Sequence, residues 1–167
     1  ATAPRKTGSI YPEPYKSRMA GRSSRRLGDL AGLTQFGVNI VTLEPGAVAS
    51  LRHWHLREDE FAMVLSGTLV LIEDEGEFPM VAGDCAAWKA GVPNGHRFVN
   101  RSDAPARFLV VGTKAPQETT TYADVDMIAH QHALYDMDTQ IFAGLDDDFT
   151  DPLAHCTLQN LAPILCR

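Results

Sequence analysis

Short apolar segments alternate with turn residues through the central part of the chain. Gly, Pro, Asn or Asp separates these segments every eight to twelve residues. Short segments with β-branched residues and period-two alternation are typical of strands. The spacing therefore predicts an all-β sandwich or small barrel. Eight strands are expected, at residues 37–46, 47–56, 60–67, 68–76, 77–84, 85–91, 95–100 and 106–114. Ser66-Gly67-Thr68 is interpreted as a hairpin turn.

Several of these expected strands are apolar on both faces, as in EFAMVLSG at residues 60–67. An outer apolar face in a sheet needs cover from another part of the chain or from a second subunit. We therefore expect either the N-terminal segment or a homodimer contact to cover it.

The flanks of this central part differ from it in charge. Residues 1–26 carry seven Lys or Arg and one acid, whereas residues 115–166 carry nine acids and no Lys or Arg. We divide the chain into an N-terminal arm at 1–36, a barrel at 37–114 and an acidic C-terminal extension at 115–167. The arm is expected to pack on the barrel or on a partner, and the extension to be mostly irregular or to form one or two short helices.

Composition restricts the classes of partner. The three cysteines are odd in number and lack a CxxC spacing, which argues against a disulfide framework or a zinc ribbon. The basic arm is interleaved with Pro, Gly and Ser, and no recognition helix follows it, so no nucleic acid partner is expected. There is no long apolar run and no signal-peptide pattern, which favours a cytoplasmic protein without a membrane partner.

Candidate chemistry is concentrated in the segment HWHLREDEF, which begins at His53. On a strand, residues i and i+2 point to the same side and lie about 6.5 Å apart. His53 and His55 therefore project together, and two imidazoles at this separation can bind one ion. A turn at residues 56–59 would return Glu60 to the same face at the start of the next strand.

A third histidine would complete a metal site, and His96 at the start of GHRFVN is the candidate. Three imidazoles and one carboxylate leave open coordination positions and suit one divalent transition metal ion, namely Zn, Fe, Mn or Ni. Of the acids in the first segment, only Glu60 is predicted to be a ligand, while Glu58 and Asp59 are expected to face water.

Each of these residues also has an ordinary structural interpretation. Many exposed strands carry a His-x-His pair, Glu60 is equally typical of a solvated turn, and His96 of a hydrogen-bonded core histidine. A second pair, His130 and His132, lies in the acidic extension without a following glutamate. We expect that second pair at the surface or at an interface.

Two longer patterns surround the candidate ligands. The first reads G-x6-H-x-H-x4-E-x6-G and runs from Gly46 to Gly67, and the second runs from Gly83 through Gly91 to Asn100. Together they resemble the two motifs of the cupin superfamily, G-x5-H-x-H-x3,4-E-x6-G and G-x5-P-x-G-x2-H-x3-N. The chain is similar to the small single-domain cupins of bacteria.

This resemblance covers roughly residues 37–114 and implies a double-stranded β-helix barrel. The chain departs from the motifs by one extra residue before His53, by Lys89 in place of a proline, and by two extra residues before His96. The resemblance also implies four metal ligands: His53, His55, Glu60 and His96.

Four more residues are predicted to line the pocket of the barrel: Trp88, Phe98, Ala62 and Val64. Asn100 is expected to hold a turn. Arg52 and Arg97 are each one residue from a candidate ligand, so they are expected on the opposite strand face.

Three functional hypotheses follow. The first is a metal-dependent dioxygenase, isomerase or lyase that acts on a small polar metabolite such as a sugar derivative. The second is a protein that uses its metal to bind or sense a small molecule without catalysis, since no acid/base partner for Glu60 is evident. The third is a structural dimer that merely retains the metal.

Overall fold

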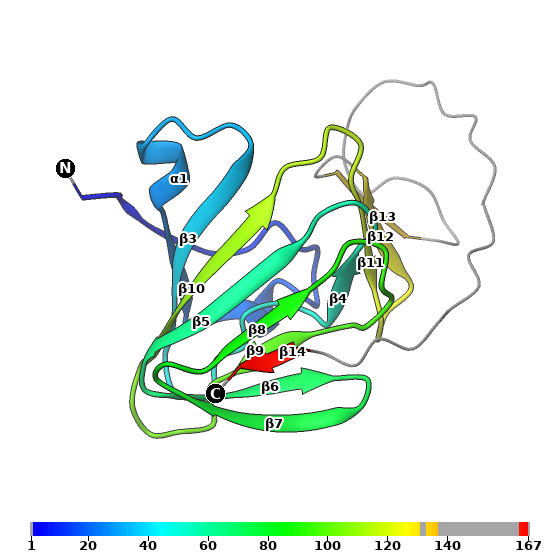
Figure 1. The fold of residues 1–167 in the computed structure, drawn as a ribbon. Helices are drawn as coiled ribbons and strands as arrows, with labels where there is room; N and C mark the ends of the chain where they lie inside the picture. Colours follow the sequence, from blue (N-terminus) through cyan, green and yellow to red (C-terminus); the bar gives the residue numbers. More distant parts are fainter. Residues whose placement is uncertain (1, 131–132, 137–163, 167) are drawn as a thin grey trace.

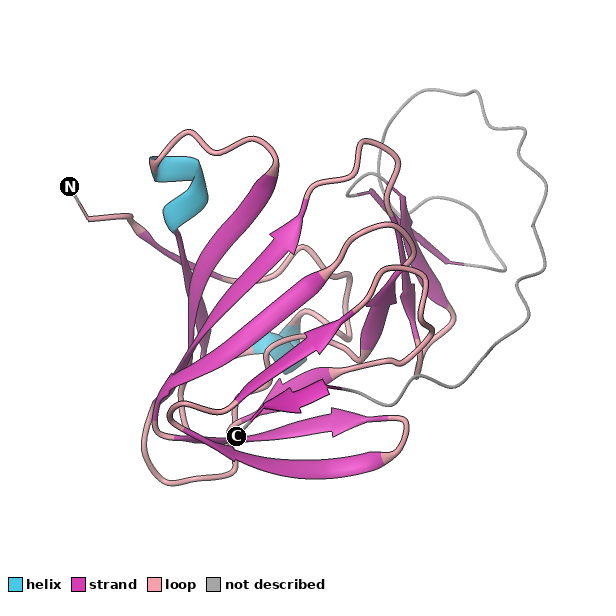
Figure 2. Ribbon diagram, in the orientation of Figure 1, coloured by secondary structure: helices cyan, strands magenta, loops and turns pink. Residues whose placement is uncertain are grey.

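The computed structural model describes residues 2–130, 133–136 and 164–166. Its elements, in chain order, are β1 (Arg5–Thr7), the 3-10 turn η1 (Ser17–Met19), β2 (Arg22–Arg26), α1 (Leu27–Leu30), β3 (Phe36–Leu43), β4 (His53–His55), β5 (Glu60–Ser66), β6 (Thr68–Glu73), β7 (Gly76–Val81), β8 (Cys85–Trp88), β9 (Arg97–Val99), β10 (Ala106–Thr113), β11 (Thr119–Tyr122), β12 (Met127–His130), β13 (Ala133–Asp136) and β14 (Ile164–Cys166). The all-β prediction is confirmed (Figure 2). Neither of the two helices in the described residues has the length and hydrophobicity needed to span a membrane.

The strands form three sheets. The largest has the order β1-β2-β3-β10-β5-β8-β14, and the other two have the orders β13-β12-β11-β4 and β7-β6-β9. Figure 1 shows β3, β10, β5 and β8 running side by side, with β4 and β11 to β13 together at one end. Alternation along β5 points Ala62 and Val64 into the core, where both are almost fully buried.

The N-terminal arm contributes two strands to the largest sheet. β2 pairs antiparallel with β3 over five residues, and β1 pairs with β2. These pairings place part of the arm beside β3 in this sheet. The division of the chain at residues 36 and 114 stays a prediction.

Gly67 does not make the hairpin that the sequence predicts. β5 pairs with β10 and β8, whereas β6 pairs with β7 and β9, so Gly67 lies where the chain passes from one sheet to another. Its φ is +77°, and a Cβ at this position would lie 2.9 Å from the Cα of Ala106. Only glycine therefore fits this close crossing of backbones. The hairpin that does form joins β6 to β7 just before Gly76.

The C-terminal extension is the main correction to the predicted fold. Where short helices or an irregular segment are expected, the described part forms β11, β12 and β13, and β14 adds to the edge of β8. Thr119–Tyr122 has three β-branched residues in succession and pairs with β4, which supplies the non-local partner that a local pattern does not reveal. The acidic turn DDDFTDP, at 146–152, lies outside the described residues.

Two apolar clusters support the sheets. The larger fills the space between the inner faces and contains residues such as Leu43, Leu71 and Phe108. The smaller packs Met19 of the arm against Leu51 and Tyr122. This second cluster joins the arm and the extension beside β4, the strand that carries two of the predicted ligands.

Candidate metal centre

β4 and the residue before β9 bring three histidines together. His53 and His55 are two residues apart on β4, so both rings project from one face. The backbones of His53 and His96 form an antiparallel bridge, in which the His96 N–H donates to the His53 carbonyl at 2.9 Å and the reverse bond is 3.2 Å. The ring centroid of His53 lies 5.0 Å from that of His55 and 4.9 Å from that of His96. This backbone bridge places the third histidine beside the first pair.

The turn after β4 returns Glu60 to the histidine face, as the sequence predicts. Asp59 fixes this turn, because its carboxylate accepts from the Ala90 N–H at 2.8 Å and its own N–H donates to Thr113 at 2.9 Å. Glu58 accepts from the Ala115 N–H at 2.7 Å. The expectation that Glu58 faces water is therefore wrong, since its side chain is only 15% exposed and binds a backbone amide. Asp59 is exposed as expected, although its carboxylate also accepts from a backbone amide.

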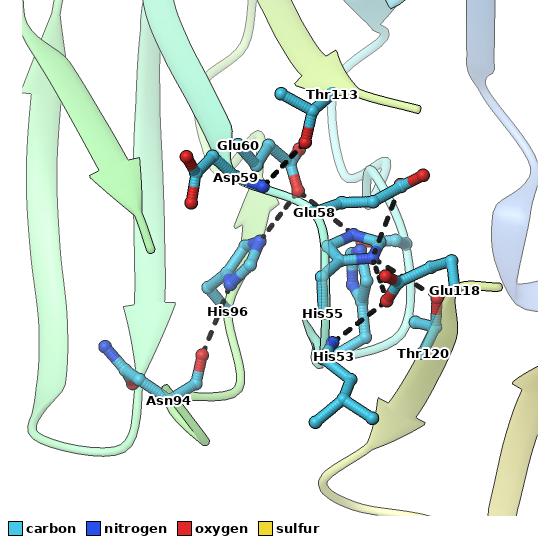
Figure 3. Close-up of polar contacts among 12 residues, drawn as sticks. His53, His55, Glu58, Asp59, Glu60, Asn94, His96, Thr113, Glu118 and Thr120 are labelled. Atoms are coloured by element: carbon cyan, nitrogen blue, oxygen red, sulfur yellow. Dashed lines mark hydrogen bonds and ion pairs between the residues drawn. The ribbon is translucent and has the colours of Figure 1, made fainter. Parts of the chain in front are cut away.

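The imidazole nitrogens and the carboxylate converge on one point. The Nε2 atoms of His55 and His96 lie 3.3 Å and 3.1 Å from the same oxygen of Glu60. One ligand atom each from His53, Glu60 and His96 lies within 4.8 Å of the others. Figure 3 shows the Glu60 carboxylate between the rings of His55 and His96. The structure thus brings all four predicted ligands together.

The outer nitrogen of each ring is held by an oxygen. Nδ1 of His53 lies 2.9 Å from the Leu51 carbonyl, and Nδ1 of His96 lies 3.3 Å from the Asn94 carbonyl. Nδ1 of His55 lies 3.3 Å from Glu118. In a metal-bound state, an acceptor at Nδ1 keeps the remaining ring proton on that nitrogen, so that Nε2 can bind the metal.

Glu118 is a residue that sequence reasoning missed. Its side chain is only 5% exposed, and besides His55 it accepts from the N–H groups of Leu56 and Arg57, both at 2.9 Å. Figure 3 shows it on the side of His55 away from His96. Glu118 follows the predicted barrel and belongs to neither motif, so no local signal in the sequence connects it with His55.

The centre also fixes the charge states of its members. Burial raises the pKa of Glu60, but hydrogen bonds from His55 and His96 outweigh this and hold that pKa well below its ordinary value. Burial and the neighbouring charge of His96 lower the pKa of His53 to about 3. Glu60 is therefore ionised and His53 neutral at neutral pH, which are the states that bind a metal.

Burial alone would lower the pKa of His55, but the hydrogen bond and charge of Glu60 and the charge of Glu118 raise it above the ordinary value. His55 thus holds a proton more readily than an ordinary imidazole. A metal that binds at Nε2 must displace that proton.

These residues fit the divalent transition metal that the sequence predicts. Three imidazoles and one ionised carboxylate match the nitrogen and oxygen ligands that Zn, Fe, Mn or Ni bind in proteins. Ligand atoms of His53, Glu60 and His96 lie close together, and Nδ1 of each of the two histidines contacts a backbone carbonyl oxygen. A chance surface cluster rarely combines these two features. A second group of acids, Glu58 and Glu118, faces the outer nitrogen of His55, so it orients the ring from behind.

An aromatic wall supports His96 from the core side. The rings of Trp88 and His96 stack with centroids 3.8 Å apart and planes 10° apart. The indole N–H of Trp88 donates to Glu73, a carboxylate that is 2% exposed and whose pKa is raised by burial. Glu73 is a second buried acid that the sequence motifs do not indicate.

A cavity of about 680 Å³ opens onto the centre and is lined by His53, Glu60 and His96. This volume is typical of small-molecule sites. Of the four residues predicted to line a pocket, Phe98 does so, whereas Trp88, Ala62 and Val64 lie in the larger apolar cluster and are not among the lining residues.

Other predicted residues are placed as follows. Asn100 holds a turn as expected, donating to the carbonyls of Leu43 and Ala104 at 2.8 Å each. Arg52 points away from the centre and binds carboxylates outside it. Arg97, in contrast to expectation, is among the cavity-lining residues. His130 ends β12 and lies 2.9 Å from Thr119 Oγ1, while His132 lies outside the described residues.

Comparison with known proteins agrees with this architecture. Residues 39–112 match the family described as Cupin domain. The crystal structure of a sugar phosphate isomerase from a cupin superfamily, from Silicibacter pomeroyi, is 60% identical, and the match covers 80% of this chain and 83% of that chain with a TM-score of 0.75. The chain therefore belongs to the cupin superfamily.

More distant structures extend the comparison. The polyketide cyclase RemF from Streptomyces resistomycificus is 25% identical, with 67% of this chain and 77% of that chain covered at a TM-score of 0.53. A cupin-2 domain from Rhodospirillum rubrum is 16% identical over 68% and 70%, at a TM-score of 0.54, and shows the fold alone. The comparison with curated proteins finds no match.

Proposed function

We propose that this chain is a metal-dependent enzyme that isomerises a small phosphorylated sugar. The observation that carries the proposal is the convergence of His53, Glu60 and His96 at the wall of a cavity large enough for a small metabolite, with Nε2 of His55 3.3 Å from Glu60. The choice of isomerase is supported by the 60% identical protein from Silicibacter pomeroyi, which is described as a sugar phosphate isomerase.

The residues around the cavity support this chemistry. A divalent ion held by the four ligands would act as a Lewis acid toward a carbonyl or hydroxyl oxygen of the sugar. Tyr122 lines the cavity with its ring 6.0 Å from that of His53, and burial raises its pKa. Its hydroxyl, which is hydrogen-bonded to that of Tyr11, therefore keeps its proton at neutral pH.

The test begins with protein purified without added metal. Elemental analysis should find about one transition metal ion per chain, and the loaded protein should interconvert at least one aldose phosphate with its ketose phosphate. His53→Ala should lose most of the metal and the activity together, because it removes one of the converging ligands. Arg101→Gln is the matched control, since Arg101 pairs with Glu77 on the exposed surface away from the centre.

Two results would contradict the proposal. Unchanged metal content in His53→Ala would mean that the metal lies elsewhere. Loaded protein that consumes oxygen with a metabolite but leaves all sugar phosphates unchanged would favour the dioxygenase alternative.

A second candidate is binding without catalysis. It is favoured by one observation: Glu60 is the only carboxylate among the described residues that line the cavity, and both histidines beside it hold it in place. No separate carboxylate is thus available there to move a proton. Multiple turnovers with any metabolite would exclude this candidate.

We also propose that the chain is a homodimer. The outer face of β5 carries exposed Phe61 and Leu65, and the paired residues of β10 on that face include Val111 and Leu109. An exposed apolar surface on a central strand favours a protein contact. The cytoplasmic location expected from the sequence stays a prediction.

A further inference from the structure

The cavity has a second wall that differs sharply from the metal centre. Four cationic side chains of the N-terminal arm line it: Lys6, Lys16, Arg22 and Arg26. The only acid among the described lining residues is Glu60, which belongs to the candidate metal centre. The chain as a whole has a formal net charge of −6. A cationic wall inside an acidic protein indicates a site that attracts an anion.

The register of β2 explains why two of these cations face inward. In an antiparallel pair, residues directly opposite each other share one face of the sheet. Arg22 lies opposite Leu43 and Ser24 lies opposite Val41, and both apolar partners are buried in the larger cluster. Alternation along RSSRR then places Arg26 on this face too, whereas Arg25 is exposed and lines a separate hollow.

Arg22 is the most buried of the four arm cations. Its Nε is buried and has no hydrogen-bond partner. Burial lowers the pKa of Arg22, Tyr11 opposes this, and the nearby charge of Arg26 lowers it further; no carboxylate is among these neighbours. Several other arginines of the described chain pair with acids, as Arg52 does with Asp74 at 2.9 Å. A half-buried guanidinium without an acid needs an anion from elsewhere.

The remaining cations lie nearer the rim. Lys6 and Lys16 are exposed, and Arg26 is 3.6 Å from Asp29 with both side chains exposed. Ser9 and Tyr11 bring side-chain hydroxyls to the same lining. Arg22 therefore provides the inner contact of the wall, while the lysines add charge at its entrance.

We propose that Arg22, assisted by Lys16 and Arg26, binds the phosphate group of a ligand whose other end reaches the candidate metal centre. This assignment rests on the proposed function for the sugar, but the phosphate site itself rests on the arm residues alone. A guanidinium with several nearby cations suits a doubly charged phosphate better than a singly charged carboxylate. In this assignment the N-terminal arm supplies the phosphate-binding side of the substrate site.

The test uses inorganic phosphate and full-length protein from which metal has been removed with a chelator. Removal of metal prevents phosphate from binding as a metal ligand. The phosphate dissociation constant, measured by phosphorus NMR at constant ionic strength, should rise at least about tenfold in Arg22→Gln, because charge-assisted hydrogen bonds are lost. Arg25→Gln is the matched control, since Arg25 lies on the same strand but faces the other way, and it should change binding less than twofold.

A second variant covers the case in which Arg22→Gln does not fold. Lys16→Gln changes an exposed residue of the arm and should weaken phosphate binding by a smaller factor, about threefold. Equal phosphate affinity in wild type and in every folded variant of the cavity wall would overturn the proposal. An equal loss in Arg25→Gln would also overturn it, because the effect would then be one of overall charge.

The result of the phosphate-binding test does not depend on whether the protein is an isomerase. If metal-free wild type binds phosphate and Arg22→Gln does not, the phosphate site stands even when no isomerase activity is found. If the enzyme is active, Arg22→Gln should raise KM for a sugar phosphate at least tenfold while KM for the same sugar without phosphate stays unchanged. A loss confined to kcat would contradict the assignment of Arg22 to binding.

Discussion

Glu118 shows how one buried carboxylate can serve both a backbone turn and a ligand. It accepts from two successive N–H groups after β4 and from Nδ1 of His55. The first two bonds fix the direction of the chain toward Glu60, and the third fixes the orientation of the ring. The positions of His55 and Glu60 therefore depend on a residue that is not itself one of the four predicted ligands.

Glu118→Gln should weaken metal binding by about 10- to 100-fold, the usual effect of losing the partner of a ligating histidine. The amide oxygen keeps one acceptor for the turn, so most of the fold should persist. Competition with a chelator gives the affinity, and circular dichroism monitors the fold. Glu77→Gln is the control, because Glu77 binds Arg101 on the exposed surface. An unchanged affinity in Glu118→Gln would show that His55 needs no such support.

His53 gives the metal-free protein a defined pH dependence. Its pKa falls from 6.5 to about 3 because of burial first and the charge of His96 second. The unfolded chain takes up a proton below pH 6.5 while the folded chain does not, so stability from this residue is fully present above pH 6.5. It is lost as the pH falls from 6.5 toward 3.

Urea unfolding of metal-free protein between pH 7.5 and pH 5 should therefore show decreasing stability. His53→Gln should have a shallower dependence over the same range, since glutamine does not titrate. Parallel curves for wild type and His53→Gln would mean that His53 does not carry this effect.

Gly67 sets the geometry at the scale of elements, because it passes the chain between two sheets. Gly67→Ala should lower the free energy of unfolding by about 2 kcal/mol or more, from the unfavourable positive φ and the clash with the backbone of Ala106. Gly46→Ala is the matched control. Gly46 has φ +78°, but nothing lies within 4 Å of the added Cβ, so only the cost of φ applies. Equal losses in the two variants would exclude the clash as a cause.

The strands of the central region are predictable because their signal is local. Every expected strand between residues 37 and 114 has a counterpart, although the one expected at 47–56 shortens to His53–His55. The strands of the extension lack such a signal. Thr119–Tyr122 becomes a strand because β4 and β12 pair with it, and that pairing is non-local.

The same distinction holds for the candidate site. The His-x-His spacing and the glutamate after a turn are local, and the structure brings these ligands together with His96. Glu118 and Arg22 are not predicted, because their roles depend on contacts across the fold. Alternation in RSSRR did carry the information that Arg22 and Arg26 share a face, but only the pairing of β2 with β3 shows that this face is the inner one.

At the scale of the molecule, the exposed apolar face of β5 predicts that two copies of the chain associate. Light scattering should give about twice the monomer mass of 18.3 kDa. Leu65→Asp should shift the protein toward monomer, because Leu65 is 40% exposed on a central strand. Val81→Asp is the control, since Val81 is 52% exposed on a strand of another sheet. A monomeric wild type would reject the dimer.

The pairing of β11 with β4 determines what could be transferred to another protein. The segment that matches the family ends at residue 112, yet β4 pairs with Thr119–Tyr122 and His55 contacts Glu118. A transplant of the matched segment alone would carry all four ligands but leave the His-x-His strand without this neighbour. The smallest portable unit of this centre therefore extends at least to Tyr122, and a designer who borrows it must take the first strand of the extension too.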